Sequence, residues 1–301
     1  MIRAFAPGIY ARSAELVQAT RDLDRGRTSA EAVGEVLARD REALVAAQEA
    51  AGLDLLVDGM LDWQDLFRPL AERTDGVEAR PLTRLLDTNT FFRALLVSGE
   101  PRLCESVPAP DLPAGPWLGT LPSPYALSRA AGGAVDALTF ATAVLGPQLE
   151  AWAAAGADLI VLDEPFVARE PGRVGELADA LRALPTSCPL VLRVPFGDAG
   201  PVLGGLAETP VAGIGVDFYS TSLDSLPRPF GKWLLAGVID VRSSSLEDPA
   251  RLVSFAERLS VLELPRIALG PNGDLQFVPE PIAREKLARL GRARQALAGA
   301  A

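Results

Sequence analysis

Short apolar runs rich in valine, leucine and isoleucine recur along this chain, and longer segments with a helical pattern separate them. Such alternation is typical of a parallel sheet whose strands are connected by helices. About eight of these runs occur, at 53–58, 94–98, 117–121, 159–163, 189–194, 211–217, 233–240 and 266–270. A closed α/β barrel needs eight strands. The sequence therefore predicts an α/β fold in the form of a (β/α)8 TIM barrel.

One barrel accounts for the whole chain of 301 residues, because α/β barrels typically need about 250 residues as a single unit. Helical segments at 28–51, 134–155, 173–184 and 245–259 carry recognisable start and stop signals. No internal repeat or change of composition divides the sequence. We expect a single domain over residues 1–301, with a surface loop at 100–116 and with residues 2–10 as candidates to lie across one barrel mouth.

The chain is acidic, with a formal net charge of −10 and a pI near 4.7. Nucleic acids and anionic membranes attract clustered lysine and arginine, so this charge disfavours both as partners. No apolar run approaches the roughly 18 residues of a membrane helix, and the N-terminal sequence has no signal-peptide pattern. We expect a cytoplasmic protein that binds a small molecule, with a protein partner as the other option.

The chain contains no histidine, the side chain whose ordinary pKa lies nearest neutrality and which is the commonest metal ligand. The two cysteines, Cys104 and Cys188, are far apart and show no CxxC spacing, so neither a disulfide scaffold nor a thiolate zinc cluster is indicated. The glycine motifs of nucleotide-binding loops and the GxSxG motif of hydrolases are absent. Any chemistry must rest on carboxylates, arginines, tyrosines and hydroxyls.

Polar side chains interrupt several apolar runs at their C-terminal ends, where barrel enzymes place their functional residues. Carboxylates and arginines together could hold a zwitterion such as an amino acid, or an anionic group. A single aspartate is more simply explained as a helix cap or ion-pair partner, but so many around one cleft favour a ligand site. The candidate ligand-binding residues are Asp58, Asp65, Asp163, Glu164, Arg193, Asp217, Tyr219, Asp240, Arg242 and Asn272. No catalytic residue can be assigned among them.

Several segments resemble the cobalamin-independent methionine synthase family, specifically its C-terminal catalytic barrel and its shorter single-barrel relatives. They are GIYARSAELVQATRDLDRG, QEAAGLDLLVDGMLDWQD, PLTRLLDTNTFFR, AGADLIVLDEP, AGVIDVRS and LGPNGDLQF, and they occur in the family's order. The resemblance implies a barrel related to uroporphyrinogen decarboxylase. In active members it also implies a zinc ion that activates the thiol of homocysteine for methyl transfer from a methylated folate or corrinoid.

The zinc ligands that the resemblance implies are replaced in this chain. An HxC pair falls on Arg193 and Pro195, a glutamate falls on Asp217, and a cysteine falls on Gly273. One carboxylate cannot supply the three or four ligands of a zinc centre. A magnesium site with oxygen ligands from Asp58, Asp163 or Asp217 is an alternative, but these residues show no diagnostic spacing. We therefore predict no metal site and no other cofactor.

The positions that bind the amino acid in the resembled family are only partly retained. An acidic residue expected after the segment GLDLLVDG falls on Met60, whereas Asp163, an amine-binding position, is kept. The resemblance therefore implies that Asp163 contacts an amine, and Arg193 or Arg242 could bind a carboxylate or phosphate.

Three functions are compatible with these residues. The first is a divergent methionine-synthase-like barrel that binds a small amino-acid-like or anionic ligand without zinc and does not methylate homocysteine. A second is a non-catalytic barrel that acts as partner or regulator of a methyltransferase or corrinoid protein. A third is a cofactor-free decarboxylase or lyase that uses Arg193, Arg242, Asp58 and Tyr219. The sequence favours the first, and does not decide whether the chain is an enzyme.

Overall fold

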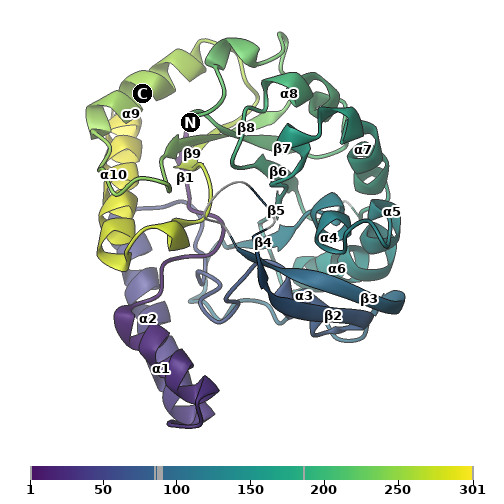
Figure 1. The fold of residues 1–301 in the computed structure, drawn as a ribbon. Coiled ribbons are helices and arrows are strands. Elements are labelled where there is room, and N and C mark those ends of the chain that lie inside the picture. Colours follow the sequence, from purple (N-terminus) through teal and green to yellow (C-terminus); the bar gives the residue numbers. More distant parts are fainter. Residues whose placement is uncertain (1, 85, 87–90, 186, 300–301) are drawn as a thin grey trace.

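A parallel, curled sheet lies at the centre of the molecule (Figure 1). A computed structural model describes residues 2–84, 86, 91–185 and 187–299, so that part of the segment PLTRLLDTNTFFR lies outside the described residues. Seven strands pair in the order β1-β9-β8-β7-β6-β5-β4. Their bounds are β1 Arg3–Ala4, β4 Leu118–Pro122, β5 Leu159–Asp163, β6 Leu190–Val194, β7 Gly213–Asp217, β8 Trp233–Ile239 and β9 Ile267–Pro271.

An extended segment around Leu56 closes this sheet into a barrel. Leu56 N donates to Pro116 O, and Leu118 N donates to Leu56 O, both at 3.1 Å, which pairs the segment in parallel with β4. On its other side, Asp54 N donates to Ala4 O in β1 at 2.9 Å. The segment predicted at 53–58 therefore occupies the eighth position between β1 and β4, and the predicted barrel is confirmed.

Two strand assignments differ from the prediction. The run at 94–98 lies outside the barrel, in β3 (Phe92–Leu103), which pairs with β2 (Thr74–Thr83) as an antiparallel ribbon. The barrel strand that replaces it is β1, which begins the segment 2–10. A strand of two residues is too short to show a period of two, whereas β3 has the apolar content of an ordinary strand. The expected loop at 100–116 begins as the end of β3, and residues 104–116 have no regular structure.

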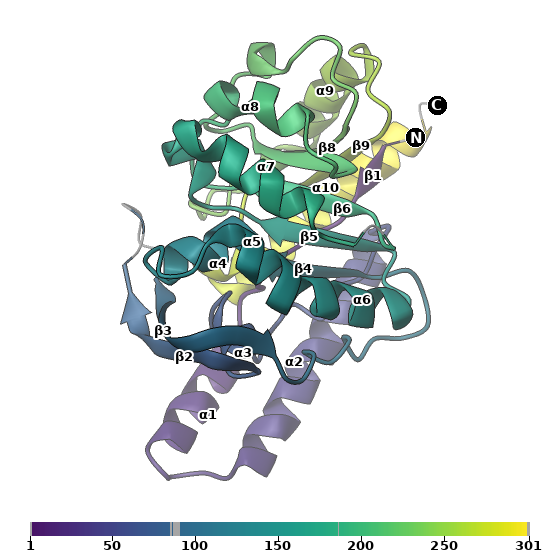
Figure 2. The same ribbon diagram turned by 90° about the vertical axis from the view of Figure 1, so that its right-hand side faces the viewer.

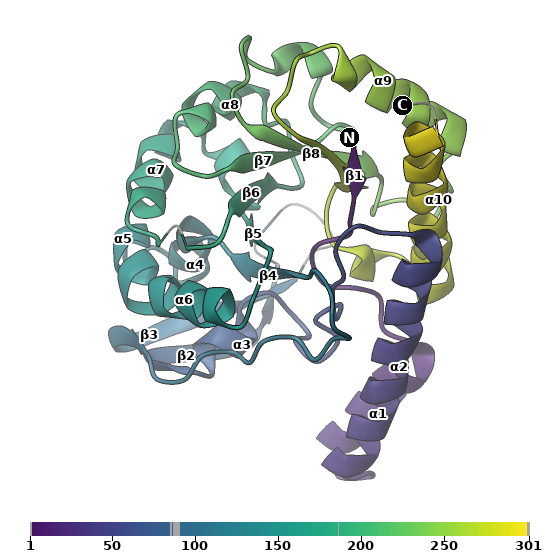
Figure 3. The same cartoon turned by 180° about the vertical axis from the view of Figure 1, so that it is seen from behind.

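Helices surround the sheet (Figures 1 and 3). The segment predicted at 134–155 forms α5 and α6, joined by a π-helical turn at Ala141–Leu145. The other predicted helical segments correspond to α2, α7 and α9. The helices against the barrel are α4 Pro124–Ala130, α5 Ala137–Phe140, α6 Gly146–Ala154, α7 Val174–Arg182, α8 Gly200–Ala207, α9 Pro249–Ser260 and α10 Glu280–Gly299. Within the described part of the chain, every helix is too short or too polar to span a bilayer.

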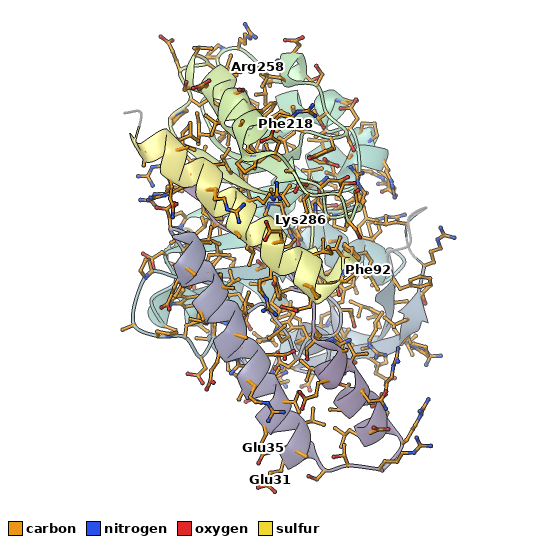
Figure 4. All side chains as sticks on the ribbon, turned by 90° about the vertical axis from the view of Figure 1, so that its left-hand side faces the viewer. Glu31, Glu35, Phe92, Phe218, Arg258 and Lys286 are labelled. Atoms are coloured by element: carbon orange, nitrogen blue, oxygen red, sulfur yellow. The ribbon has the colours of Figure 1, made fainter. Side chains whose placement is uncertain are left out.

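Helices α1 (Ala14–Asp24) and α2 (Ala30–Ala51) form a hairpin that projects from the barrel (Figure 2). Ser13 and Ser29 cap them by accepting from backbone N–H groups at 3.0 and 3.2 Å. The last turns of α2 pack against α10, where a Cβ on Gly291 would lie 2.1 Å from Ala51 O, so only glycine fits. Glu31, in the first turn of α2, lies at the end of the hairpin that is far from the barrel (Figure 4).

The barrel interior is layered from apolar to polar. Near the N-terminal ends of the strands it is filled by Phe5, Leu55, Val57, Leu118, Leu159, Val161, Val191, Leu235 and Ala268. Alternate residues of a strand face the same side. The next interior layers toward the carboxyl ends therefore hold Thr120, Asp163, Arg193, Asp217 and Asn272, all of which are buried. Four of the polar candidates from the sequence, Asp163, Arg193, Asp217 and Asn272, therefore lie at this end of the barrel.

Candidate functional site

Arg193 lies in the barrel interior on β6, with a side chain only 2% exposed. Its Nε and Nη2 donate to the two oxygens of Asp163, each at 2.5 Å, and Nη2 also donates to Asp274 Oδ1 at 2.6 Å. Its Nη1 donates to Pro7 O and Gly273 O at 3.0 and 3.1 Å. A guanidinium has five N–H bonds, and all five have partners here. A ligand anion could bind Arg193 only by displacing one of them.

The cluster of Arg193, Asp163 and Asp274 is tightly enclosed. Burial raises the pKa of Asp274 to about 6, against the opposing charge of Arg193. Gly8, with a φ of +96°, lies against the cluster, and a Cβ there would be 2.1 Å from Asp274 Oδ1 and 2.5 Å from Arg193 Nη2. Asp163, predicted to contact a ligand amine, has both oxygens bound to Arg193. The cluster therefore fills the barrel mouth with charges that already have partners.

A second polar cluster joins the ends of β7, β8 and β9. Asp217 Oδ1 accepts from Asn272 Nδ2 and from Tyr219 N, each at 2.9 Å. Arg242 Nη2 lies 3.2 Å from Asp217 Oδ2, and its Nε lies 3.3 Å from Asp240 Oδ1. Asn272 Nδ2 is also within 3.3 Å of Asp240 Oδ1. Five predicted residues thus come together, and Arg242, with a side chain 37% exposed, faces solvent.

Glu164 and Asp65 serve as local caps. Glu164 Oε1 accepts from two backbone N–H groups at 2.8 and 3.0 Å, and its other oxygen accepts from Ser123 Oγ. Burial raises the pKa of Glu164 to about 7. Asp65 Oδ1 accepts from two backbone N–H groups at 2.9 and 3.2 Å, and its Oδ2 lies 3.1 Å from Arg93 Nε. Both carboxylates are engaged within the protein.

Asp58 lines a cavity of about 410 Å³ beside the barrel mouth, which we call the Asp58 cavity. Burial raises the pKa of Asp58, and its Oδ1 accepts from Met60 N at 3.0 Å. Asp58 and Trp63 also line a small space of about 20 Å³ inside the mouth itself. The charged side chains around the Asp58 cavity are Arg41, Asp58, Asp62, Arg68, Glu72, Arg73 and Asp111.

Two arginines line the Asp58 cavity with donors that lack partners. Nε of Arg41 and Nε of Arg73 are both buried and make no hydrogen bond. Arg41 Nη1 lies 3.8 Å from Asp111 Oδ2, and Arg73 Nη1 donates to Pro69 O at 3.2 Å. Buried donors without acceptors are costly and uncommon. Arg41 belongs to α2 and Arg73 follows α3 (Arg68–Ala71), so a search of strand ends could not find them.

The residues at the implied zinc positions do not fit a zinc ion. Arg193 is cationic and fully hydrogen-bonded, Pro195 and Gly273 offer no side-chain donor, and both oxygens of Asp217 have protein partners. A zinc centre takes three or four nitrogen, sulfur or oxygen ligands. Across the described residues, no group of three or more Cys, Asp or Glu could hold a metal ion.

The comparisons with known proteins agree on one family. A family model described as "Cobalamin-independent synthase, N-terminal domain" matches residues 122–262. The 5-methyltetrahydropteroyltriglutamate--homocysteine methyltransferase of Mycobacterium tuberculosis (strain ATCC 25618 / H37Rv) is 28% identical over 324 residues, which cover 87% of this chain and 42% of that protein. Its counterpart in Rhodococcus jostii (strain RHA1) is 30% identical over 275 residues, which cover 76% of this chain and 36% of that protein. This chain belongs to the cobalamin-independent methionine synthase family.

This methionine synthase relative spans less than half the length of the curated proteins it matches. The matching family model is that of the N-terminal domain, whereas the sequence segments resembled the C-terminal barrel. Two solved methionine synthases have the same fold. The B12-independent enzyme from Shewanella sp. W3-18-1, in complex with selenomethionine, gives a TM-score of 0.73 at 18% identity over 91% of each chain. The putative enzyme from Listeria monocytogenes gives 0.74 at 17% identity over 99% of each chain.

Proposed function

We propose that this chain is a methionine-synthase-like barrel that binds a small amino acid in the Asp58 cavity, without zinc and without methylating homocysteine. The observation that carries the proposal is the pair of buried, unpartnered Nε donors of Arg41 and Arg73 in the same cavity as the Asp58 carboxylate. An amino acid carries both complementary charges on one carbon. A site with guanidinium and carboxylate groups in one cavity can hold both.

Each side chain has a distinct role in this proposal. The guanidinium groups of Arg41 and Arg73 bind the ligand's carboxylate, and Asp58 binds its ammonium group. Trp63, which also lines the cavity, supplies an apolar wall for the ligand's side chain. Asp163, assigned to the amine from the sequence, has both oxygens bound to Arg193, so Asp58 takes that role.

The relatives support an amino acid as the ligand class. The curated relatives are named for a reaction of homocysteine, and the Shewanella structure holds selenomethionine. Homocysteine is a sulfur-containing amino acid, and selenomethionine is the selenium analogue of methionine. The loss of the methyl-transfer reaction is inferred from the residues at Arg193, Pro195, Asp217 and Gly273, which cannot assemble a zinc-thiolate centre.

The remaining alternatives are less well supported. A decarboxylase would use Arg193, Arg242, Asp58 and Tyr219 together. Asp58 and Tyr219 line two different cavities, so they cannot act on one substrate together. Every N–H group of Arg193 already has a partner within the protein. A role as partner or regulator of a methyltransferase stays a prediction, which co-purification with such a protein would test.

Calorimetric titration tests the proposed ligand class. We expect methionine or homocysteine to bind with a 1:1 stoichiometry. Two analogues isolate the two charges, since 4-(methylthio)butanoate lacks the ammonium group and 3-(methylthio)propylamine lacks the carboxylate. Both should bind at least about tenfold more weakly, because each leaves a buried charged group without its partner. An analogue that binds as tightly as methionine and loses this affinity in Asp58→Asn would argue against recognition of a zwitterion in the Asp58 cavity.

Variants locate the binding site. Arg73→Gln and Asp58→Asn should each weaken amino-acid binding by about tenfold or more. Arg102→Gln is the matched control, because Arg102 is 72% exposed on the β2–β3 ribbon. If Arg73→Gln and Asp58→Asn both bind like the control, the Asp58 cavity is not the site. Formation of methionine from homocysteine and a methylated folate would overturn the non-catalytic part of the proposal.

A further inference from the structure

A second cavity of about 410 Å³ lies between the outer face of β8 and helix α9, which we call the α9 pocket. Val238 from β8, Leu252 and Phe255 from α9, and residues 243 and 245–248 of the connecting loop line it. Its lining shares no residue with that of the Asp58 cavity. Its volume lies within the range of about 300–1,000 Å³ that is typical of small-molecule sites.

The walls of the α9 pocket are largely apolar. Phe218, Val238, Leu246, Leu252 and Phe255 contribute side chains. The rings of Phe218 and Phe255 are in contact, with centroids 5.1 Å apart and planes tilted by 58°. Figure 4 shows Phe218 beside α9. Such walls favour a ligand with an aromatic or aliphatic body.

Glu247 brings an unpartnered carboxylate oxygen to this pocket. Its side chain is only 7% exposed, and Oε1 accepts from Lys286 Nζ and Asp240 N, each at 2.8 Å. Oε2 is buried and has no hydrogen-bond partner. The Tyr219 hydroxyl donates to Val238 O at 3.3 Å. Burial, the charges of Glu247 and Asp240, and the approach of this hydroxyl to the Glu247 carboxylate raise the pKa of Tyr219.

The carboxylate of Glu247 is held firmly in place. Lys286, on α10, is fully buried, and its Nζ also donates to Ser245 O at 2.7 Å. Arg289 Nη1 donates to Glu247 O at 2.9 Å. These contacts fix Oε1 and the backbone of Glu247, whereas the buried Oε2 makes no hydrogen bond. The charged residues that line the pocket are Asp240, Glu247, Asp248 and Arg251. Because three of them are carboxylates and one is a guanidinium, the pocket disfavours anionic ligands.

We propose that the α9 pocket binds a primary amine with an apolar body. The ammonium group donates to Glu247 Oε2, and the apolar body lies against Phe218 and Phe255. A charged donor suits a carboxylate oxygen, since hydrogen bonds between ionised groups are stronger than those between neutral ones. This site does not depend on the proposed amino-acid site in the Asp58 cavity.

Three probes with one apolar body test the chemistry by calorimetric titration. They are phenethylamine, 2-phenylethanol and 3-phenylpropanoate. We expect the amine to bind with a 1:1 stoichiometry, the alcohol to bind at least about tenfold more weakly, and the carboxylate to show no binding. The proposal is overturned if the carboxylate binds as well as the amine, or if the amine shows no binding.

Variants assign the amine to Glu247. Glu247→Gln keeps an acceptor for Lys286 but places an amide N–H2 at the position of Oε2, so amine affinity should fall by about tenfold or more. Glu257→Gln, an exposed change on α9, should leave it unchanged. Leu246→Arg, at a position 38% exposed, places a cation at the pocket and should abolish amine binding without disturbing Glu247. Unchanged binding in both Glu247→Gln and Leu246→Arg overturns the proposal.

Discussion

Glu164 combines complete burial with three hydrogen bonds to its carboxyl group. Burial raises its pKa from the ordinary value of 4.5 to about 7. The folded state therefore binds a proton more tightly than the unfolded state does. The stability that this proton contributes is present below about pH 4.5 and is lost as the pH rises through 7.

Glu164→Gln should remove this pH dependence. In the wild type, the free energy of unfolding should fall between pH 5 and pH 8 by up to roughly 2–3 kcal/mol from this group. Glutamine stays neutral, accepts from the same backbone N–H groups and can donate to Ser123 Oγ, so its curve should be flatter. Urea unfolding at four pH values in this range measures the difference, with exposed Glu257→Gln as control. Parallel curves for wild type and Glu164→Gln would contradict the assignment.

Single residues show where prediction from sequence succeeds and where it stops. The rule that parallel strands end at one mouth was enough to bring Asp217, Asp240 and Asn272 together. The same rule does not predict that every N–H group of Arg193 is bound within the protein, because two of the acceptors are the backbone carbonyl groups of Pro7 and Gly273. Nor could it find Arg41, which reaches its cavity from a helix.

Among the secondary-structure elements, Arg193 joins four parts of the chain. From β6 it binds Asp163 at the end of β5, Gly273 and Asp274 after β9, and Pro7 after β1. These elements come from both ends of the sequence, so the contacts hold the closed barrel together at its mouth.

Arg193→Met should destabilise the fold strongly, because it leaves Asp163 and Asp274 buried without their cation. We expect the free energy of unfolding to fall by about 3–5 kcal/mol, as when one partner of a buried ion pair is removed. Arg182→Met, at an exposed helical position, should change it by less than about 0.5 kcal/mol. Urea unfolding at pH 7 compares the two. A loss below about 1 kcal/mol for Arg193→Met would show that the cluster contributes little.

At the level of elements, periodicity found the long features and missed the short ones. The helices at α2, α7 and α9 and the strands from β4 to β9 carry enough residues to show their period. The barrel position at Leu56 was found from its apolar run, but β1 has two residues and no pattern. The antiparallel β3 was taken for a barrel strand, because a strand's apolar content does not reveal its pairing partner.

Across the whole molecule, the family's barrel is retained while its mouth is filled by paired charges. Two cavities of about 410 Å³ each lie beside the mouth, at Asp58, and outside the sheet, at α9. In the function that we propose, the Asp58 cavity binds the ligand and no zinc centre at the mouth takes part. Fold class and family could be predicted from the sequence, because both rest on long segments. The cavities could not, since they are formed by side chains from helices and loops.

Zinc retention tests the central claim most directly. The protein is incubated with excess zinc, passed through a desalting column, and analysed by mass spectrometry for metal per chain. A Cys104→Ser/Cys188→Ser double variant is measured in parallel, because Cys104 is exposed and could bind zinc adventitiously. We predict well below one zinc per chain in both proteins. One tightly held zinc per chain that persists in the double variant would contradict the account, since it would require a metal centre built from oxygen ligands at the barrel mouth.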